Sequence, residues 1–247
     1  MKRLDQALVE RGLFQSREKA KRAVIAGAVR INQQKASKPS DNVKDTDTLE
    51  VEAGEKFVSR GGYKLEHALE SFSISVSGSR VLDVGSSTGG FTDCLLQRGA
   101  DQVYAIDVGQ GQLAWKLRQD PRVVVMEKTN ARELTEGHFP RPFVPVDFAV
   151  IDCSFISLKK ILPPVVALIR PLGSIVALIK PQFEAGKAEA DRGGGVIRDP
   201  VIHARVLREL EEFVATLPQL HWKRSTDSPL LGPAGNKEFL ALIEKRS

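Results

Sequence analysis

Five apolar runs alternate with segments of helical pattern between residues 80 and 180, and this alternation restricts the fold more than any other feature of the sequence. The runs are RVLDVG, QVYAID, VVVME, VDFAVID and SIVALIK. Strands that alternate with helices are joined by right-handed crossovers, so they form a parallel, doubly wound sheet. The ending LHWKRSTDSPLLGPAGNKEFLALIEK instead predicts two strands joined by a turn-rich loop. We therefore predict an α/β fold whose mostly parallel sheet finishes with an antiparallel strand.

A small α+β module is predicted before this sheet. Leu4, Ala7 and Leu8 repeat at helical spacing, and Gly12 marks the end of that helix. A second helix is predicted from Ser16, a typical N-cap residue, to Gly27. The segments AVRINQQ and TLEVE follow as short strands. We expect this module at residues 1–56, a linker containing the SRGG tetrapeptide at residues 57–62, and a second domain at residues 63–247.

Positive charge is concentrated in the first of these domains. Residues 2–38 contain ten Lys or Arg and three Asp or Glu, a net charge of 10 − 3 = +7, whereas the whole chain carries +5. A cationic helix face suits the phosphates of structured RNA, although such a face can also be simply solvated. The residues predicted to contact RNA there are Arg3, Arg17, Lys19, Lys21 and Arg22.

Other features argue against export, a membrane span and a metal site. Cys94 and Cys153 are too few for a disulfide framework or a zinc cluster, and the N-terminus lacks an apolar signal-peptide core. Residues 161–179 are largely apolar, but prolines and the central Arg170 favour a buried helix and strand over a membrane span. The four histidines lack the spacing of metal ligands. We expect a cytoplasmic protein without a metal or stable membrane association, and the sequence does not predict its oligomeric state.

The predicted strand at residues 80–84 leads directly into a glycine-rich turn, VLDVGSSTGGF. Glycine is needed where backbone approaches a ligand closely or adopts positive φ, as we expect at Gly85, Gly89 and Gly90. The G-x-x-x-G-G spacing differs from the G-x-G-x-x-G fingerprint of dinucleotide-binding enzymes, so hydride transfer is disfavoured. Asp107 ends the next strand, where a carboxylate can accept both ribose hydroxyls of a nucleoside. The turn is either a nucleoside-cofactor site or a tight strand–helix connection.

Four charged residues lie at predicted element boundaries. Asp152 and Lys180 follow the fourth and fifth strands, Lys64 lies at the start of a helix, and Glu238 begins the last strand. Open sheets bind ligands in the crevice at the carboxyl ends of their strands. A lysine accepts a proton near neutral pH only where burial or nearby positive charge lowers its pKa and a carboxylate orients it. We therefore expect either one catalytic cluster or four separate solvated charges.

These motifs resemble those of a known family. The turn VLDVGSSTGGF is similar to the D-x-G-x-x-x-G-G-F/W pattern of the FtsJ-like RNA methyltransferases, and RLDQALVERGLFQSREKAKRAVIAGAVRIN resembles the alpha-L RNA-binding domain. With RGGYKLEHAL, DCSFISLKKILP, ALIKPQFEAGK, GGGVIRDP and GNKEFLAL, nearly the whole chain resembles the TlyA family, whose members are also named hemolysins. The departures, such as Tyr63 and Ser86, are conservative.

The resemblance implies a Rossmann-like methyltransferase domain that uses S-adenosylmethionine to methylate the ribose 2'-hydroxyl of a cytidine in ribosomal RNA or a ribosomal subunit. It implies that the four boundary residues, Lys64, Asp152, Lys180 and Glu238, form a catalytic tetrad. Asn130 is then expected at the adenine edge, and Arg60 is expected to contact RNA. The residues expected to bind the cofactor are Asp83, Gly85, Ser86, Ser87, Thr88, Gly89, Gly90, Phe91, Asp107 and Asn130.

Other activities would place different requirements on the same residues. Cytosine C5 methylation would use Cys153 as nucleophile, and base N-methylation would need a Pro-Pro-aromatic turn that DCSF lacks. A membrane-active hemolysin and an inactive RNA-binding scaffold are the remaining alternatives. The loop from Pro181 to Pro200 is expected either to close over RNA as a mobile lid or to be a disordered connection. Phe155 is expected either to stack on a base or to belong to the core.

Overall fold

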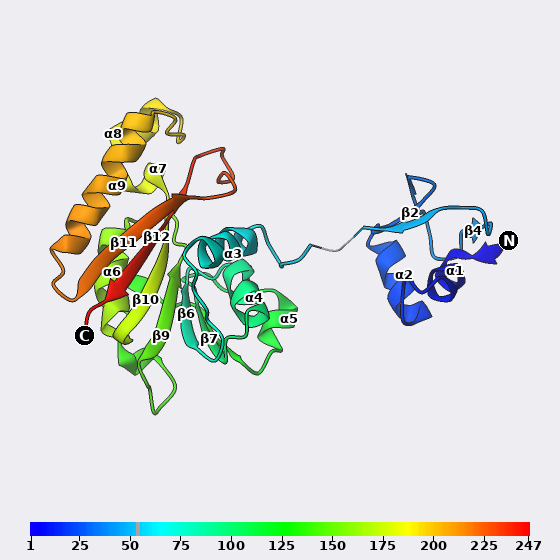
Figure 1. The fold of residues 1–247 in the computed structure, drawn as a ribbon, viewed down its shortest axis with the longest axis horizontal. Helices are drawn as coiled ribbons and strands as arrows, with labels where there is room; N and C mark the ends of the chain where they lie inside the picture. The colour runs from blue at the N-terminus through cyan, green and yellow to red at the C-terminus, as the bar shows by residue number, and fades with distance from the viewer. Residues whose placement is uncertain (53–54) are drawn as a thin grey trace. The chain divides into compact units, whose positions relative to one another are not determined.

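A computed structural model describes residues 1–52 and 55–247 of the chain (Figure 1). These residues form two compact units, Met1–Lys56 and Phe57–Ser247. The stretch 57–62, which the sequence assigned to a linker, belongs to the second unit. Phe57 is buried in that unit's core, and helix α3 (Gly61–Ser71) begins within the stretch. The SRGG tetrapeptide therefore leads into a helix and is not a hinge.

The first unit packs two helices against short strands. Helix α1 (Leu4–Glu10) and helix α2 (Arg17–Ile25) enclose a core with the strands around them. The hydroxyl of Ser16 accepts a hydrogen bond from the backbone N–H of Lys19 at 3.3 Å, which confirms the predicted start of α2. The strands are β1 (Lys2–Arg3) paired with β4 (Asn42–Val43), and a sheet of β3 (Gln34–Lys35), β2 (Val29–Ile31) and β5 (Leu49–Val51).

The second unit is built on one seven-stranded sheet in the order β11-β12-β10-β9-β6-β7-β8. The strands are β6 (Arg80–Val84), β7 (Gln102–Ile106), β8 (Val123–Met126), β9 (Val146–Ile151), β10 (Ile169–Ile179), β11 (Leu220–Asp227) and β12 (Phe239–Lys245). Strands β8, β7, β6, β9 and β10 are parallel, whereas β12 is antiparallel to both β10 and β11. The predicted mostly parallel sheet with an antiparallel strand at its end is confirmed.

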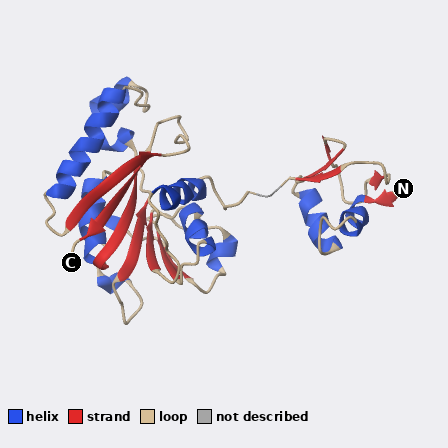
Figure 2. Cartoon of the chain, in the orientation of Figure 1, coloured by secondary structure: helices blue, strands red, loops and turns tan. Residues whose placement is uncertain are grey.

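Helices cover both faces of this sheet (Figure 2). On one face lie α3, α4 (Gly90–Gln97) and α5 (Trp115–Arg118), and on the other lie α6 (Leu158–Ala167) and α9 (Pro200–Ala215). The residues 181–200 contain two short helices, α7 (Pro181–Glu184) and α8 (Lys187–Arg192). The 3₁₀ turns η1 (Ala131–Glu133) and η2 (Glu136–His138) follow β8. Each face thus buries its own apolar cluster against the helices.

The largely apolar stretch at residues 161–179 forms most of α6 and β10, two buried elements of this layered core. Arg170 lies exposed in this stretch and pairs with Asp147 at 2.7 Å. Within the described residues, we found no helix with the length and apolar character that crossing a membrane requires.

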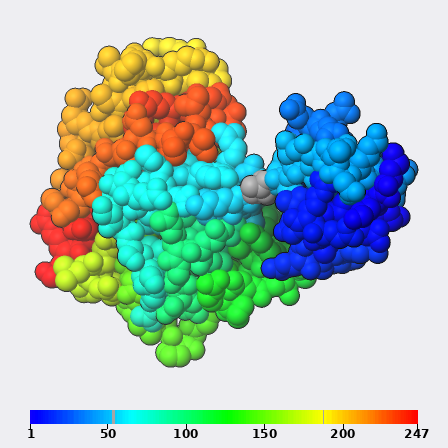
Figure 3. Space-filling view, turned by 45° about the vertical axis from the view of Figure 1, so that its right-hand side comes forward, coloured from blue at the N-terminus to red at the C-terminus, as the bar shows by residue number. Residues whose placement is uncertain are grey.

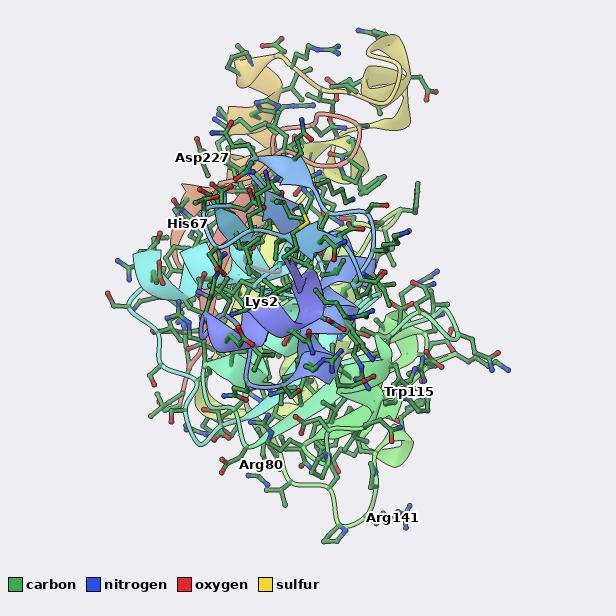
Figure 4. All side chains as sticks on the ribbon, turned by 90° about the vertical axis from the view of Figure 1, so that its right-hand side faces the viewer. Lys2, His67, Arg80, Trp115, Arg141 and Asp227 are labelled. Atoms are coloured by element: carbon green, nitrogen blue, oxygen red, sulfur yellow. The ribbon has the colours of Figure 1, made fainter. Side chains whose placement is uncertain are left out.

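The carboxyl ends of the parallel strands share one edge of the sheet. Figure 4 shows Arg80, the first residue of β6, in the lower part of the view and Asp227, the last residue of β11, in the upper part. Asp107 and Asp152 follow β7 and β9 directly, and Lys180 follows β10, so all three lie at the carboxyl edge. A ligand site is expected at this edge in an open α/β sheet.

Candidate active site

The glycine-rich turn between β6 and α4 is required by close packing. Gly85 has a φ of +87°, and a Cβ placed on it would lie 2.4 Å from the backbone oxygen of Asp152. Gly89, with a φ of +94°, is the N-cap of α4, and a Cβ there would lie 2.2 Å from Leu117. A side chain at Gly85 would clash with the backbone of Asp152, and one at Gly89 would be strained at its positive φ and would displace the Leu117 side chain.

Two adjoining pockets lie at the carboxyl edge of the sheet. The first has a volume of about 520 Å³, and the second has a volume of about 460 Å³. Both are lined by Gly85, Ser87, Asp152 and Ser154. The first pocket contains the four predicted catalytic residues together with Arg60 and the turn residues Ser86, Thr88, Gly90 and Phe91. The second contains Asp107, Asn130, Arg132 and Gln112.

The carboxylate of Asp107 is fixed at the mouth of the second pocket. Oδ2 accepts the backbone N–H of Ser87 at 2.8 Å, and Oδ1 accepts that of Gly109 at 2.7 Å. Each carboxylate oxygen has about two acceptor positions, so each retains capacity for a further donor. The side chain of Asn130 caps η1 by accepting the backbone N–H of Arg132 and donating to Glu133.

Asp83 and Gly89 were predicted to bind the cofactor, but among the described residues they line neither pocket. Asp83 is fully buried behind the turn, where its Oδ2 accepts the hydroxyl of Thr92 at 2.5 Å. Its Oδ1 has no hydrogen-bond partner within residues 1–52 and 55–247. Burial raises the pKa of the Asp83 carboxyl to about 7. The contacts of both residues therefore point to a role in holding the turn.

The raised pKa of Asp83 predicts a specific pH dependence of stability. The folded state retains this proton up to about pH 7, whereas an unfolded aspartate loses it near pH 4, so stability falls as pH rises from about 4 through 7. The loss is at most about 4 kcal/mol for a shift of about three pKa units. Between pH 5 and 8, the free energy of unfolding of the Asp83→Asn variant should fall less than that of the wild type. Urea denaturation at both pH values measures the difference, and equal losses in the two proteins would refute it.

The four predicted catalytic residues form two ion pairs in the first pocket. Lys64 Nζ lies 2.5 Å from Glu238 Oε2, and both side chains are nearly or fully buried. Lys180 Nζ lies 2.6 Å from Asp152 Oδ1 and donates a hydrogen bond to the hydroxyl of Ser154 at 2.9 Å. Lys180 is 11% exposed and Asp152 is 23% exposed, so this second pair faces the pocket more openly. The alternative of four separate solvated charges is wrong.

Each pair retains a buried carboxylate oxygen with spare acceptor capacity. Among the described residues, Glu238 Oε1 has no hydrogen-bond partner. Asp152 Oδ1 likewise has none with hydrogen-bond geometry, although Lys180 Nζ stands at ion-pair distance from it. A buried acceptor without a donor is costly, and a pocket that binds a hydroxyl-bearing ligand can supply one.

Two neighbours of Asp152 bear on the competing activities. Burial raises the pKa of the Cys153 thiol to about 12, and its Sγ lies 3.7 Å from the backbone oxygen of Val84. Such a thiol is a poor nucleophile, which argues against cytosine C5 methylation. Phe155 is 89% exposed, so it is not a core residue, and its ring packs on that of Phe183 with centroids 4.9 Å apart. Its φ of +63° is uncommon for a non-glycine residue.

The predicted RNA-contacting residues fall in both units. Arg3 and Arg17 both pair with the buried carboxylate of Asp5, at 3.1 and 3.0 Å, and Arg3 contributes most to lowering the pKa of Asp5 to about 2. The side chain of Lys19 donates to Gln15, and Arg22 lies 3.9 Å from Glu18, while Lys21 is on the same helix. Arg60 lies instead in the second unit, where it lines the first pocket and donates to the backbone oxygen of Leu231 at 2.9 Å.

Sequence reasoning missed several residues in and around these pockets. Ser154 was not singled out, although it follows Asp152 by two positions and contacts Lys180. Gln112 and Arg132 line the second pocket from loops without a recognisable pattern. Asn236 was also missed, although it lies two residues before Glu238 in the segment GNKEFLAL. For Ser154 and Asn236, proximity to a charged strand-end residue was the only available signal.

Comparisons with known proteins agree with this geometry. The FtsJ-like methyltransferase family matches residues 57–245, and the S4 domain matches residues 2–49. The chain is 48% identical to the 16S/23S rRNA (cytidine-2'-O)-methyltransferase TlyA of Mycobacterium tuberculosis, over 99% of this chain and 90% of that protein. It is 43% identical to Hemolysin A of Brachyspira hyodysenteriae, over 97% of this chain and 98% of that protein. The chain also resembles a solved structure from Streptococcus thermophilus that is named as a candidate hemolysin. The match covers 100% of this chain and 89% of that one, with 45% identity and a TM-score of 0.74.

Proposed function

Because the chain belongs to the TlyA family of FtsJ-like methyltransferases and carries an N-terminal S4 domain, we propose that it methylates the ribose 2'-hydroxyl of a cytidine in ribosomal RNA, with S-adenosylmethionine as the methyl donor. The observation that carries this proposal is the pair of Lys–carboxylate contacts in a pocket that adjoins a nucleoside-sized pocket. A methyl donor in the second pocket and a ribose in the first would meet at the residues that both pockets share.

The second pocket has donors and acceptors that fit the cofactor. The two oxygens of Asp107 are already oriented by backbone N–H groups and keep the capacity to accept two ribose hydroxyls. Gly85, Ser87, Asp107 and Asn130 line this pocket and would hold the cofactor, whereas the turn residues Ser86, Thr88 and Gly90 line the adjoining first pocket. When bound, S-adenosylmethionine supplies an electrophilic methyl group, and the protein supplies orientation and electrostatics.

The first pocket can bind the ribose and receive its proton. In its neutral form, Lys180 accepts the proton of the 2'-hydroxyl at Nζ, while Asp152 and Ser154 orient that nitrogen. In the transfer, the ribose oxygen would gain a bond to the methyl carbon as its own O–H bond and the methyl–sulfur bond of the sulfonium break. The neutral thioether S-adenosylhomocysteine would leave, and the proton would later pass from Nζ to water. Lys64, held by Glu238, provides a cation in the same pocket. The exposed Phe155 lines the second pocket, where it is available to stack on a base.

The first unit is proposed to hold the ribosomal RNA through its cationic helix face. The substrate would place the protein in the cytoplasm, where ribosomal RNA is assembled. Naked RNA and an assembled subunit are both compatible with a phosphate-directed surface.

The direct test is incubation with radiolabelled S-adenosylmethionine and either ribosomal RNA or isolated subunits. We expect incorporation into RNA, and alkaline hydrolysis should leave the labelled nucleotide in a resistant dinucleotide because a 2'-O-methyl group blocks cleavage. The modified nucleotide is then mapped by primer extension. Label in an alkali-sensitive mononucleotide would indicate base methylation and contradict the proposal, as would an absence of incorporation with every RNA substrate.

The cationic face of α2 gives a further prediction. Arg17→Ala combined with Lys21→Ala should weaken RNA binding and lower the slope of log affinity against log salt by about 1 to 2, because each phosphate contact contributes roughly 0.7 to 0.9. Cofactor affinity should not change. Binding is measured by fluorescence anisotropy across a salt series with the full chain.

Arg208→Ala is the matched control for this double variant. Arg208 lies on the surface of α9 and pairs with Glu212 at 3.9 Å, so its replacement removes an exposed cation from the second unit and leaves α2 unchanged. This control should retain the wild-type salt slope. An unchanged slope in the Arg17, Lys21 double variant would show that α2 does not contact phosphates.

A further inference from the structure

Asn236 is a buried amide in the turn between β11 and β12. Its side chain is 2% exposed, and both of its polar atoms are used by one segment of chain. Oδ1 accepts the backbone N–H of Ile197 at 2.9 Å, and Nδ2 donates to the backbone oxygen of Gly195 at 2.9 Å. The amide therefore ties the end of the 181–200 stretch to the turn that leads into β12.

The same turn encloses the carboxylate of Glu238. The backbone oxygen of Asn236 accepts the N–H of Gly232 at 2.9 Å, and a Cβ on Gly232 would lie 2.5 Å from Glu238 Oε1. The backbone oxygen of Glu238 accepts the N–H of Ser228 at 2.9 Å, which closes the base of the turn. The path of residues 232–236 thus limits where the Glu238 carboxylate can lie, and that carboxylate holds Lys64.

The segment on the other side of Asn236 is itself anchored. Ile197 is buried, and its backbone oxygen lies 3.0 Å from His203 Nε2. The buried ring of His203 packs edge-on against Phe239, the first residue of β12, with centroids 5.5 Å apart. Figure 3 shows the orange surface of the β11–β12 turn between the yellow surface of the preceding segment and the cyan surface of α3. The end of the 181–200 stretch is therefore held by Asn236 and His203, which differs from the disordered connection considered from sequence.

The geometry points to Asn236 as a positioning residue for the Lys64–Glu238 pair. Its amide fixes the path of the turn, and the turn fixes the position of the Glu238 carboxylate. That carboxylate in turn holds Lys64 Nζ in place. This role rests on the proposed catalytic function of the pair. Asn236 lines neither of the two pockets, so its effect on the reaction passes through Glu238.

Asn236→Asp is the sharpest single change because it keeps the size of the side chain. The variant retains an acceptor for Ile197 but places an oxygen against the backbone oxygen of Gly195. We expect kcat for methyl transfer to fall by about 10- to 100-fold, since small misplacement of a catalytic group has effects of this size. The affinity for S-adenosylhomocysteine should stay within about twofold, and Asn236→Ala, normalised to the fraction of protein that binds this ligand, should behave alike.

Lys245→Met is the matched control. Lys245 is the last residue of β12, the strand that the Asn236 turn leads into, and its Nζ donates to the backbone oxygens of Val166 and Ile169 at the far end of that strand. Lys245→Met removes two side-chain hydrogen bonds, as Asn236→Ala does, without affecting the turn, so its kcat should match the wild type. A similar loss of kcat in both variants would show that Asn236 acts through the stability of β12 alone and would overturn the inference.

A double-mutant cycle with Glu238→Gln separates the inference from the function on which it rests. If Asn236 acts through Glu238, adding Asn236→Asp to Glu238→Gln should lower the single-turnover rate by less than about twofold further. If the rate losses of the two single variants multiply in the double variant, or if Asn236→Asp alone has the wild-type rate, the inference is overturned. Neither result would affect the catalytic role proposed for the tetrad. A wild-type rate for Glu238→Gln would instead refute the catalytic role of the pair, and the positioning role would fall with it.

Discussion

Replacing Lys180 with methionine is expected to lower the rate of methyl transfer by about 10²- to 10⁴-fold, the range typical for loss of a proton-accepting side chain. Lys180 Nζ is the group of the first pocket that both contacts a carboxylate and donates to Ser154. Methionine keeps most of the buried side-chain volume but cannot receive a proton. Single-turnover methylation of ribosomal RNA measures the rate, and calorimetry with S-adenosylhomocysteine should give a wild-type affinity because Lys180 does not line the second pocket.

Lys223→Met provides the control for this experiment. Lys223 lies on β11 and also pairs with a carboxylate, that of Glu244 at 3.0 Å, but on the surface. Loss of this exposed pair is expected to change stability by less than about 1 kcal/mol and to leave the rate unchanged. A Lys180→Met protein that transfers methyl groups at the wild-type rate would remove Lys180 from the chemistry and the present assignment of the proton acceptor with it.

The prediction of the sheet succeeded because its parallel strands are buried on both faces. Such strands are continuous apolar runs, and each run here ends at a charged residue or glycine that marks the carboxyl edge. The hairpin β11–β12 was equally visible because two strand-like runs flank a segment rich in glycine and proline. Local pattern was therefore sufficient for the order and direction of these elements.

The assignment of residues 57–62 to a linker was mistaken because glycine has two uses. In SRGG it suggested a hinge, but Gly62 is packed against Phe57, where a Cβ would lie 2.2 Å from the ring. Gly90 is likewise packed against Ser59, with a Cβ 2.2 Å from its hydroxyl. These glycines allow α3, α4 and the preceding segment to approach closely. Nothing in the local sequence distinguishes a glycine needed for flexibility from one needed for close packing.

Which residues belong to the site was easier to predict than which of them form ion pairs. Strand direction places Asp152 and Lys180 at one edge, which the sequence could indicate. The partnership of Lys64 with Glu238 joins residues 174 positions apart and depends on how α3 packs beside β12. The same limit explains Asp83, which lies in the cofactor motif but points into the core. Side-chain direction at a turn is set by tertiary packing, so a motif alone cannot separate residues that touch a ligand from those that support the turn.

Replacing Asp107 with alanine should weaken cofactor binding, whereas Lys180→Met should lower the transfer rate and leave cofactor binding unchanged. We expect the affinity for S-adenosylhomocysteine to fall by about 10- to 100-fold, since each hydrogen bond to a charged group contributes about 1.5–3 kcal/mol. The variant also frees the backbone N–H groups of Ser87 and Gly109, which loosens the turn. Asp107→Asn keeps one acceptor oxygen and should show an intermediate loss. Calorimetry in the absence of RNA measures cofactor binding without any contribution from the transfer step.

Glu127→Gln is the matched control for Asp107, because Glu127 also accepts a backbone N–H from the same loop, that of Gly111 at 2.8 Å, and pairs with Arg118. Glu127 does not line the second pocket, so its variant should bind the cofactor product normally. Saturating S-adenosylmethionine should restore much of the transfer rate in Asp107→Ala, because the tetrad is intact, whereas no cofactor concentration should restore Lys180→Met. If Asp107→Ala binds as tightly as Glu127→Gln, the nucleoside does not occupy the second pocket in the proposed way, and its position must be sought elsewhere at this edge.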